Sequence, residues 1–248
     1  MKKILILGAT SAVIEPVIEK LYQEGAELML AARDIVKLNQ FIQRIQATLP
    51  TAKSKIYPII MNVIDFNTHK LLFEEAILQL GSVDCILVAY GQMTDPLTSE
   101  TQWNEFLQEQ NVNYLSVTSY LHPFINYFEA QKKGSIAVIT SVAGDRMRRS
   151  NYVYGLSKGC LSLYLEALRT RLKPIGIRIV DIKLGFVRSP MTKKMQKHPL
   201  LSSPKNVAAS ITNALNCGCS VVYVPGYWRY IMLIIKLIPS FIFYRLKI

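Results

Sequence analysis

Apolar and polar segments alternate in a regular order along the 248-residue chain. Short apolar runs predict buried strands, because strands of a parallel sheet covered on both faces are apolar almost throughout. The predicted strands are residues 3–8, 27–33, 55–63, 84–90, 135–141, 177–184 and 220–224. Longer segments between these runs predict helices. The predicted helices are residues 12–24, 34–49, 66–80, 102–128, 152–172 and 204–216.

The alternation of strands with helices predicts an α/β fold. We expect a doubly wound, Rossmann-type α/β/α sandwich around a mostly parallel, seven-stranded sheet. Half of the residues are hydrophobic, enough for one large domain with a substantial core. No repeat or linker divides residues 1–226, so we expect a single domain there, followed by an apolar, basic tail over residues 227–248.

The chain carries a formal charge of +12, from 29 Lys and Arg against 17 Asp and Glu. Such an excess permits binding to nucleic acid, to an anionic membrane or to an acidic ligand. No nucleic-acid-binding signature accompanies it, so we expect no nucleic-acid partner. Lysines spread over solvated surfaces account for most of the excess.

The four cysteines point neither to a disulfide framework nor to a metal site. Cys85 and Cys160 lie in apolar segments and read as small core residues. Cys217 and Cys219 have no His or further Cys pair at ligand spacing, so we expect no metal. The apolar run at the N-terminus is too short for a signal peptide, which favours a cytoplasmic location.

The most informative polar residues are Tyr154 and Lys158, four positions apart in one predicted helix. At that spacing both side chains lie on the same helix face. A nearby ammonium favours the phenolate, and so lowers the pKa of a tyrosine from about 10 toward the range useful for acid/base catalysis. Ser141 ends the preceding strand and can add a hydroxyl to the same pocket. Taken alone, a Tyr and a Lys at this spacing often occur by chance on helix surfaces.

The turn after the first predicted strand begins with Gly8. A glycine turn at a helix N-terminus presents backbone N–H groups and a positive dipole end to a pyrophosphate. Thr10 and Ser11 can add hydroxyls or cap the helix. The glycine pattern is degenerate, because Ala12 and Ile14 stand where later glycines are expected. A plain strand–turn–helix is the alternative.

Arg33 closes the second predicted strand, where the adenosine ribose of a dinucleotide would lie. Ala32 offers no acceptor to a free 2′-hydroxyl, whereas Arg33 could bind a 2′-phosphate through charge-assisted hydrogen bonds. This pair favours NADPH over NADH, and a solvated arginine is the alternative. We expect Asp34 to cap the following helix.

In this order, the elements resemble the short-chain dehydrogenase/reductase superfamily from residue 2 to about residue 226. The matching motifs are residues 8–14, Asn62-Val63, Ala89-Tyr90-Gly91, Asn111-Val112-Asn113, Leu184-Gly185-Phe186-Val187 and the catalytic set Asn113, Ser141, Tyr154 and Lys158. The resemblance implies NADPH/NADP as cofactor. Its implied contacts are Gly8, Thr10, Ser11, Ala12, Val13, Arg33, Asn62, Val63, Ala89, Gly91, Tyr154, Lys158 and Val187. Ile14 departs from the family pattern, and we expect its bulk to alter packing of the first helix and cofactor affinity.

The resemblance also implies a mechanism, the reduction of a carbonyl by hydride transfer from the nicotinamide. Tyr154 would exchange the proton on the carbonyl oxygen, and Lys158 would lower the Tyr154 pKa and bind the nicotinamide ribose. Ser141 would hydrogen-bond the carbonyl oxygen. Asn113 would hold a water in a proton relay. Family members usually form homodimers or homotetramers through two long helices, here residues 102–128 and 152–172.

Two basic segments flank the expected mouth of the active site. One holds Arg146, Arg148 and Arg149, and the other holds Lys193, Lys194, Lys197 and His198. Such clusters suit phosphate or carboxylate, although each residue alone is more often a solvated charge. Residues 228–248 are apolar, aromatic and basic, and Pro239 interrupts them, which favours peripheral contact with the inner face of a membrane over a spanning helix. A hydrophobic arm packed on protein is the alternative.

Several loop sequences and the tail are similar to a subgroup that includes reductases of polyprenyl-phosphoryl keto-pentoses. This likeness implies a phosphate-bearing, lipid-linked carbonyl substrate. Two other readings stay open. One is a generic reductase of lipid or ketoacyl carbonyls, and the other is a non-catalytic dinucleotide-binding scaffold.

Overall fold

The computed structural model describes residues 2–52, 54–195 and 197–246, without the side chains of residues 194 and 195. Within these residues, seven strands form one sheet in the order β3-β2-β1-β4-β5-β6-β7, and every neighbouring pair is parallel. The strands are β1 (Lys3–Leu7), β2 (Glu27–Ala32), β3 (Ile56–Ile60), β4 (Cys85–Val88), β5 (Gly134–Ser141), β6 (Ile177–Leu184) and β7 (Val221–Val224). The predicted doubly wound α/β fold is confirmed, and the sheet is parallel throughout.

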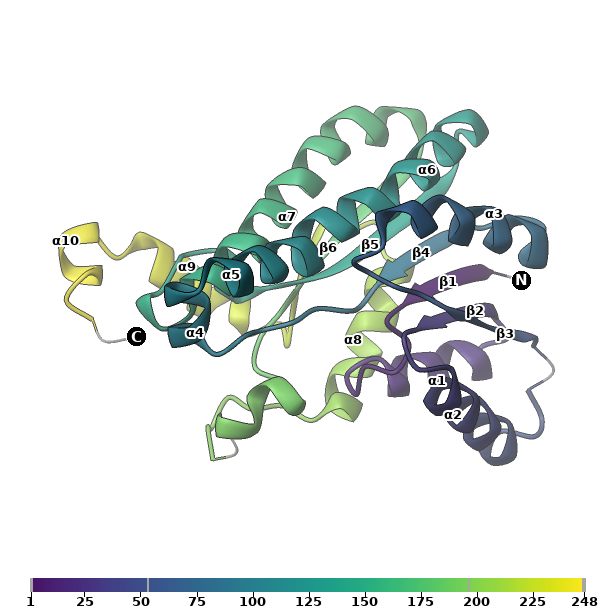
Figure 1. Ribbon diagram of the computed structural model, residues 1–248, viewed down its shortest axis with the longest axis horizontal. Coiled ribbons are helices and arrows are strands. Elements are labelled where there is room, and N and C mark those ends of the chain that lie inside the picture. The colour runs from purple at the N-terminus through teal and green to yellow at the C-terminus, as the bar shows by residue number, and fades with distance from the viewer. Residues whose placement is uncertain (1, 53, 196, 247–248) are drawn as a thin grey trace.

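Helices cover both faces of the sheet, with α1, α2 and α8 on one side and α3, α6 and α7 on the other (Figure 1). The helices are α1 (Glu15–Gln23), α2 (Ile35–Thr48), α3 (His69–Leu80), α4 (Pro96–Thr101), α5 (Trp103–Gln110), α6 (Ser116–Gln131), α7 (Tyr152–Leu172), α8 (Pro204–Asn216), α9 (Trp228–Leu237) and α10 (Ser240–Phe243). Successive strand residues point to opposite faces, so each strand contributes side chains to the two cores on either side of the sheet. In β1, Ile4 and Ile6 join one core while Leu5 and Leu7 join the other.

The first helix begins three residues later than the sequence predicts. Residues 8–14 form turns, and the N–H groups of Ile14 and Glu15 both donate to the Ser11 carbonyl. Pro16 then occupies the first turn of α1, a position that tolerates its missing N–H. Ile14 is fully buried in the core beneath α1, so its bulk fills space between helix and sheet. Its effect on cofactor affinity stays a prediction.

The long helix predicted over residues 102–128 is divided. It consists of α5, a π-helical turn over Asn111–Leu115, and α6, which continues to Gln131. A π-turn inserts an extra residue into a helix and re-aims the side chains around it, and such turns often occur at functional sites. Here the turn carries Asn113, which is completely buried.

All strands run in the same direction, so their carboxyl ends meet at one edge of the sheet. Because the strand order reverses between β1 and β4, a crevice for a ligand is expected at that edge. The turns after β1, β4, β5 and β6 carry most of the predicted site residues.

The tail is a helical extension that packs against this edge at its beginning. Trp228 is buried and clusters with Val142 and Met232. Gly185 makes this packing possible, because a Cβ atom there would lie 1.9 Å from the Trp228 indole nitrogen. Pro239 separates α9 from α10, the interruption expected from the sequence. No helix in the described residues is long and apolar enough to cross a membrane.

Candidate active site

The centre of the site forms where α7 crosses the turn after β5. Glycines allow this crossing. A Cβ atom on Gly144 would lie 2.7 Å from the Gly159 backbone nitrogen, and one on Gly155 would lie 2.9 Å from the Ala143 carbonyl oxygen. The backbone of α7 therefore lies against the end of β5, and Tyr154 reaches Ser141. The structure brings Ser141, which the sequence placed at the end of a strand, next to Tyr154 and Lys158 on the following helix.

Tyr154 is partly buried, and its environment favours the protonated phenol. Burial raises the pKa of Tyr154 to about 12, against a lowering by its hydrogen bond with the Ser141 hydroxyl and a further rise from the charge of Glu109. The sequence predicts a lowering of the Tyr154 pKa by Lys158, but Lys158 is not among the causes of the shift, which burial dominates. The Lys158 Nζ lies 6.0 Å from the centroid of the Tyr154 ring. Ser141 Oγ also accepts from the Ala143 N–H at 3.1 Å, which leaves its own proton free to donate.

Lys158 is buried with only 3% of its surface exposed. Burial lowers the pKa of Lys158 to about 8, although the carboxylates of Asp181 and Glu109 raise it. Its Nζ donates to the Ile139 carbonyl at 3.3 Å, which fixes the ammonium near the end of β5. Below a pH of about 8 the group is therefore a cation held at a defined place behind Tyr154.

Asn113 ties the loop after β4 to the π-turn. Its Oδ1 accepts from the Gln92 N–H at 2.7 Å, and its Nδ2 donates to the Gln92 carbonyl at 2.7 Å. Both ends of the amide are thus occupied by one residue of the loop. Gly91 sits in this corner, where a Cβ atom would come within 3.1 Å of Asn113 Oδ1 and 3.2 Å of Lys158 Nζ. Asn113 therefore positions the loop that faces Lys158, a task that the sequence did not predict, while its water relay stays a prediction.

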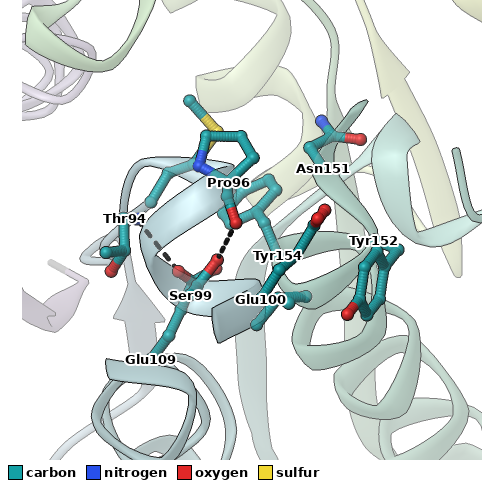
Figure 2. Close-up of a pocket in the computed structure, with 10 residues that line it drawn as sticks. Thr94, Pro96, Ser99, Glu100, Glu109, Asn151, Tyr152 and Tyr154 are labelled. Atoms are coloured by element: carbon teal, nitrogen blue, oxygen red, sulfur yellow. Dashed lines mark hydrogen bonds between the residues drawn. The ribbon is translucent and has the colours of Figure 1, made fainter. Parts of the chain in front are cut away.

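Glu109 is a buried acid that the sequence analysis missed. It lies on α5 with 1% of its surface exposed, and its Oε2 accepts from the Thr94 N–H at 2.9 Å. Burial raises the pKa of Glu109, against lowering contributions from Thr94 and from the charge of Lys158. Glu109 and Tyr154 line the same small recess (Figure 2). The signal was its spacing, since Glu109 stands four positions before Asn113 on the same inward helix face.

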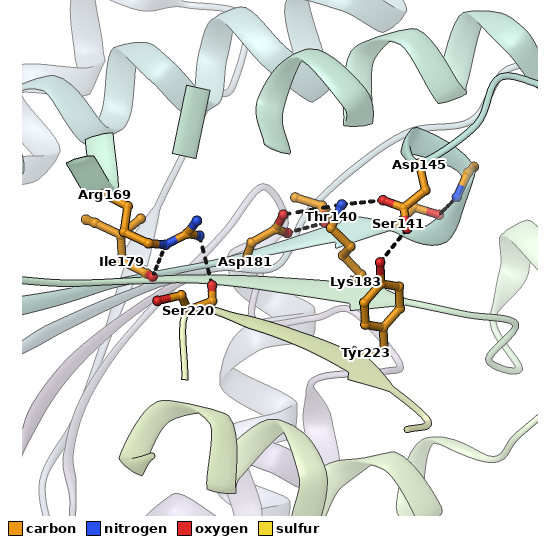
Figure 3. Close-up of polar contacts among 10 residues, drawn as sticks. Thr140, Ser141, Asp145, Arg169, Ile179, Asp181, Lys183, Ser220 and Tyr223 are labelled. Carbon is orange, nitrogen blue, oxygen red and sulfur yellow. Dashed lines mark hydrogen bonds and ion pairs between the residues drawn. The ribbon is translucent and has the colours of Figure 1, made fainter. Parts of the chain in front are cut away.

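A second buried polar group supports Ser141 from the far side of β5. Lys183 forms an ion pair with Asp145 and approaches Asp181 at 3.8 Å, and Tyr223 donates to Asp145 at 2.6 Å (Figure 3). Thr140, beside Ser141, hydrogen-bonds to Asp181. These contacts fasten the turn after Ser141 to β6 and β7, so they hold the Ser141 hydroxyl in place.

The turn after β1 offers free N–H groups of the kind that bind a pyrophosphate. Gly8 adopts φ +89°, and a Cβ atom there would lie 2.8 Å from Tyr90, so the turn after β1 touches the turn after β4. Among the described residues, the N–H groups of Thr10, Ala12 and Val13 donate no hydrogen bond. Free N–H groups at a helix start suit an anion. Ser11, Ala89 and Val187 lie in or beside the turns at this edge.

The adenosine end of the predicted cofactor site lies at the ends of β2 and β3. Ala32 is buried, whereas Arg33 is exposed and makes no ion pair among the described residues. Asp34 caps α2 by accepting from the Lys37 N–H at 3.0 Å, as predicted. Asn62 Oδ1 accepts from the Ile64 N–H at 3.3 Å, and Val63 is buried beside it. The chain's residues thus fit a dinucleotide.

The two predicted basic segments meet at Phe186, just after β6. The guanidinium of Arg148 lies 5.9 Å from the Phe186 ring centroid, and the His198 ring packs edge-on at 4.9 Å. Arg146 turns away and binds the tail. It donates to the carbonyls of residues 235, 236 and 238 and stacks on Phe243 at 3.9 Å. Lys193 and Lys197 are exposed, and the side chain of Lys194 lies outside the described residues.

The described residues hold no cluster of potential metal ligands. In the part of the chain that the structure describes, no three His, Cys, Asp or Glu side chains gather closely enough to hold an ion.

Comparison with known sequences agrees with this geometry. Residues 2–200 match the family described as short chain dehydrogenase. An uncharacterized oxidoreductase of Mycobacterium tuberculosis is 29% identical over 222 residues, covering 90% of this chain and 88% of the relative. One of Streptomyces coelicolor is 27% identical over 248 residues, covering 100% and 96%. One of Listeria innocua is 33% identical over 178 residues, covering 72% and 70%.

Solved structures share the fold at low sequence identity. A short-chain type dehydrogenase/reductase from Mycobacterium ulcerans matches with a TM-score of 0.81 at 17% identity, covering 90% of this chain and 88% of that one. ElxO with NADP bound matches with a TM-score of 0.81 at 18% identity, covering 92% and 99%. At these identities the likeness concerns the fold alone.

The contribution of the two hydrogen bonds between Asn113 and Gln92 can be tested by measuring the free energy of unfolding. Asn113→Ala leaves the partly buried N–H and carbonyl of Gln92 without these partners, which should lower the free energy of unfolding by roughly 2–4 kcal/mol. Urea titration followed by circular dichroism measures the loss. Asn111→Ala is the matched control, because Asn111 lies in the same π-turn and its side chain makes no hydrogen bond among the described residues. Equal stability of the two variants would show that the clamp contributes nothing.

Proposed function

The chain belongs to the short-chain dehydrogenase/reductase family and is an NAD(P)-dependent oxidoreductase, and from that premise we propose that it is an NADPH-dependent reductase converting a carbonyl into an alcohol. The observation that carries the proposal is the state of Tyr154. Burial raises the pKa of Tyr154 to about 12, so near neutral pH the side chain holds the proton that reduction of a carbonyl consumes.

Each remaining catalytic side chain has a task in this reaction. The Ser141 hydroxyl donates to the carbonyl oxygen and stabilises the charge that develops there. Tyr154 gives its proton to the same oxygen. Lys158, a buried cation below about pH 8, offsets the negative charge left on Tyr154 and binds the ribose beside it. When bound, NADPH supplies the hydride.

We further propose a substrate that carries a phosphate or another anion. Arg148 and His198 support this, because both contact Phe186 beside the turn after β6 and neither makes an ion pair among the described residues. A phosphorylated lipid or sugar, such as a polyprenyl-phosphoryl keto-pentose, fits a basic mouth next to an apolar tail. A generic reductase of lipid or ketoacyl carbonyls would not need these cations. A non-catalytic scaffold would not need the buried Ser141–Tyr154 pair.

The outer face of the tail favours peripheral attachment to an anionic membrane. Trp228 and Met232 point inward, whereas Leu233, Ile234 and Leu237 are 55%, 66% and 73% exposed. The exposed cations Arg229, Lys236 and Arg245 surround this face, while Lys247 lies outside the described residues. Each cation near an anionic surface contributes about 1 kcal/mol. Oligomerisation through α6 and α7, as is common in the family, is compatible with this proposal.

Proton transfer is predicted to need the Tyr154 hydroxyl. Tyr154→Phe should lower reduction of an activated ketone such as 2,3-butanedione by roughly 10²- to 10⁴-fold, because the proton donor is lost while ring packing stays. NADPH fluorescence should show unchanged cofactor binding, whereas Lys158→Met should impair both binding and turnover. Tyr152→Phe, an exposed tyrosine lining the same recess, serves as control. Wild-type turnover by Tyr154→Phe would rule out the assigned role.

Cofactor preference is predicted to depend on Arg33. Arg33→Ala should weaken NADPH binding by about 10-fold or more and leave NADH binding nearly unchanged, because only NADPH carries the 2′-phosphate. Fluorescence titration of both cofactors measures the change, with the exposed Lys37→Ala as control. Equal affinities of the wild type for both cofactors would contradict the preference.

Membrane attachment is predicted to depend on the exposed face of α9. The wild type should sediment with anionic vesicles and be partly released by high salt. A double variant, Leu233→Glu with Ile234→Glu, should stay in the supernatant, whereas Leu78→Glu, 76% exposed on α3, should sediment normally. Point variants are preferable to truncation, because Trp228 packs against Gly185. If the double variant instead changes only the oligomeric state, the face packs on protein.

A further inference from the structure

A histidine buried between α3 and α6 has no part in the proposed reaction. His69 is the first residue of α3, and 1% of its surface is exposed. Its ring stacks on that of Tyr120 from α6, with the ring centroids 3.6 Å apart. Burial lowers the pKa of His69, although backbone hydrogen bonds and the charge of Asp65 raise it. Near neutral pH the ring is therefore neutral, and one of its two nitrogens carries a proton.

Two polar contacts determine which ring nitrogen of His69 carries that proton. Nε2 lies 3.3 Å from the carbonyl oxygen of Asn62, and Nδ1 lies 2.9 Å from the hydroxyl of Ser119 on α6. A carbonyl oxygen can only accept, so Nε2 carries the proton and donates it, while Nδ1 accepts from Ser119. The imidazole therefore joins α6 to the segment between β3 and α3.

The Asn62 carbonyl oxygen receives two further donors. The hydroxyl of Tyr120 donates to it at 3.3 Å, and so does the N–H of Asp65, from within the same turn, at 3.3 Å. Tyr120 is completely buried, and burial raises the pKa of Tyr120, so the hydroxyl keeps its proton for this bond. Two side chains from different helices thus converge on one backbone oxygen.

Asn62 lies where the adenine of the cofactor is expected. The N–H of Met61 donates to the Ala32 carbonyl at 3.0 Å, so Asn62 is the next residue after the pairing of β3 with β2. The side chain of Asn62 is exposed, and its Oδ1 accepts from the Ile64 N–H. Its Nδ2 donates no hydrogen bond among the described residues. An amide with a free donor and a remaining lone pair can bond the edge of an adenine ring.

Apolar packing alone does not explain a histidine at this place. A leucine would fill a similar space without burying two polar nitrogens, each of which has to be bonded. Both nitrogens of His69 are bonded, and one of the bonds reaches the residue that ends the paired strand. The two side-chain donors therefore fix the backbone at the point where strand pairing no longer does.

We propose that His69 and Tyr120 are positioning residues for cofactor recognition, which hold the Asn62 carbonyl and so direct the Asn62 amide toward the adenine ring. Neither side chain touches the cofactor, and both act through Asn62. The inference rests on the proposed contact of Asn62 with adenine. It concerns the adenosine half of the cofactor, which NADPH and NADH share.

The test titrates 5′-AMP and 2′,5′-ADP, the adenosine halves of NADH and NADPH, by ligand-observed NMR. His69→Leu and Tyr120→Phe should each weaken the binding of both fragments by about 3- to 10-fold, the range for one lost hydrogen bond. His69→Gln should recover most of the affinity, because the NH₂ group of glutamine can replace the Nε2 donor. NMN, the nicotinamide half, should bind every variant as it binds the wild type.

Phe124→Leu is the matched control for loss of packing. Phe124 is buried one turn after Tyr120 on α6, and its ring contacts Phe73 and Phe128. This variant should lower the temperature of thermal unfolding and bind both adenosine fragments like the wild type. An equal loss of fragment binding in Phe124→Leu, or unchanged binding in His69→Leu and Tyr120→Phe, overturns the proposal.

A double-mutant cycle shows whether His69 acts through Asn62. Asn62→Ala removes the amide and keeps the carbonyl, so adding His69→Leu to it should weaken 5′-AMP no further. A further loss as large as that in the wild-type background overturns the positioning role. Equal binding of 5′-AMP and 2′,5′-ADP to the wild type contradicts only the preference for NADPH, because the effect of His69 on 5′-AMP still decides this inference. Binding of neither fragment to the wild type overturns both.

Discussion

The active site depends on the absence of three Cβ atoms. Gly144, Gly155 and Gly159 let the backbone of α7 lie against the turn after β5, where any larger residue would overlap backbone atoms at 2.7–3.0 Å. This contact fixes the distance from Tyr154 to Ser141, because the two side chains belong to the two surfaces that touch. The ion pair between Lys183 and Asp145 also fastens the turn after β5 to β6. The contact between α7 and the turn after β5 therefore fixes both the packing and the relative positions of Tyr154 and Ser141.

Burial shifts the pKa values of Tyr154 and Lys158 more than neighbouring charges do. Tyr154 and Lys158 lie in the same buried region, and burial acts on them in opposite directions, because it disfavours the phenolate and the ammonium alike. The pKa of Tyr154 rises to about 12 and that of Lys158 falls to about 8. Glu109 acts on both. It raises both pKa values, and so it favours a protonated pair.

The tail packs against two turns at the edge of the sheet where the site lies. Near its start, Trp228 packs beside Gly185 in the turn after β6, and Arg146 reaches from the turn after Ser141 to the C-terminal end of α9. The apolar outer face of α9 is therefore held at a fixed angle to the mouth where Arg148 and His198 lie.

The sequence by itself determined the fold class and the order of its elements. Continuous apolar runs identified the strands, and all seven lie within one residue of the ranges that the pattern predicted, although the edge strands β3 and β7 are partly exposed. It also singled out Ser141, Tyr154 and Lys158, because their spacing is local along one strand and one helix. It missed α4, which is too short for periodicity to reveal, and the later start of α1, which Pro16 sets.

Only the tertiary structure decided how these residues act. The clamp of Asn113 on Gln92, the turn of Arg146 toward the tail and the free oxygen of Glu109 each depend on contacts between elements distant in sequence. The same holds for the pKa of Tyr154, since sequence spacing shows the neighbouring Lys158 but not the extent of burial. Periodicity reports which way a side chain faces along its own helix or strand. The groups that a side chain contacts are set by tertiary packing. Here packing determined the protonation of Tyr154, the hydrogen bonds of Asn113 to Gln92 and the unpaired oxygen of Glu109.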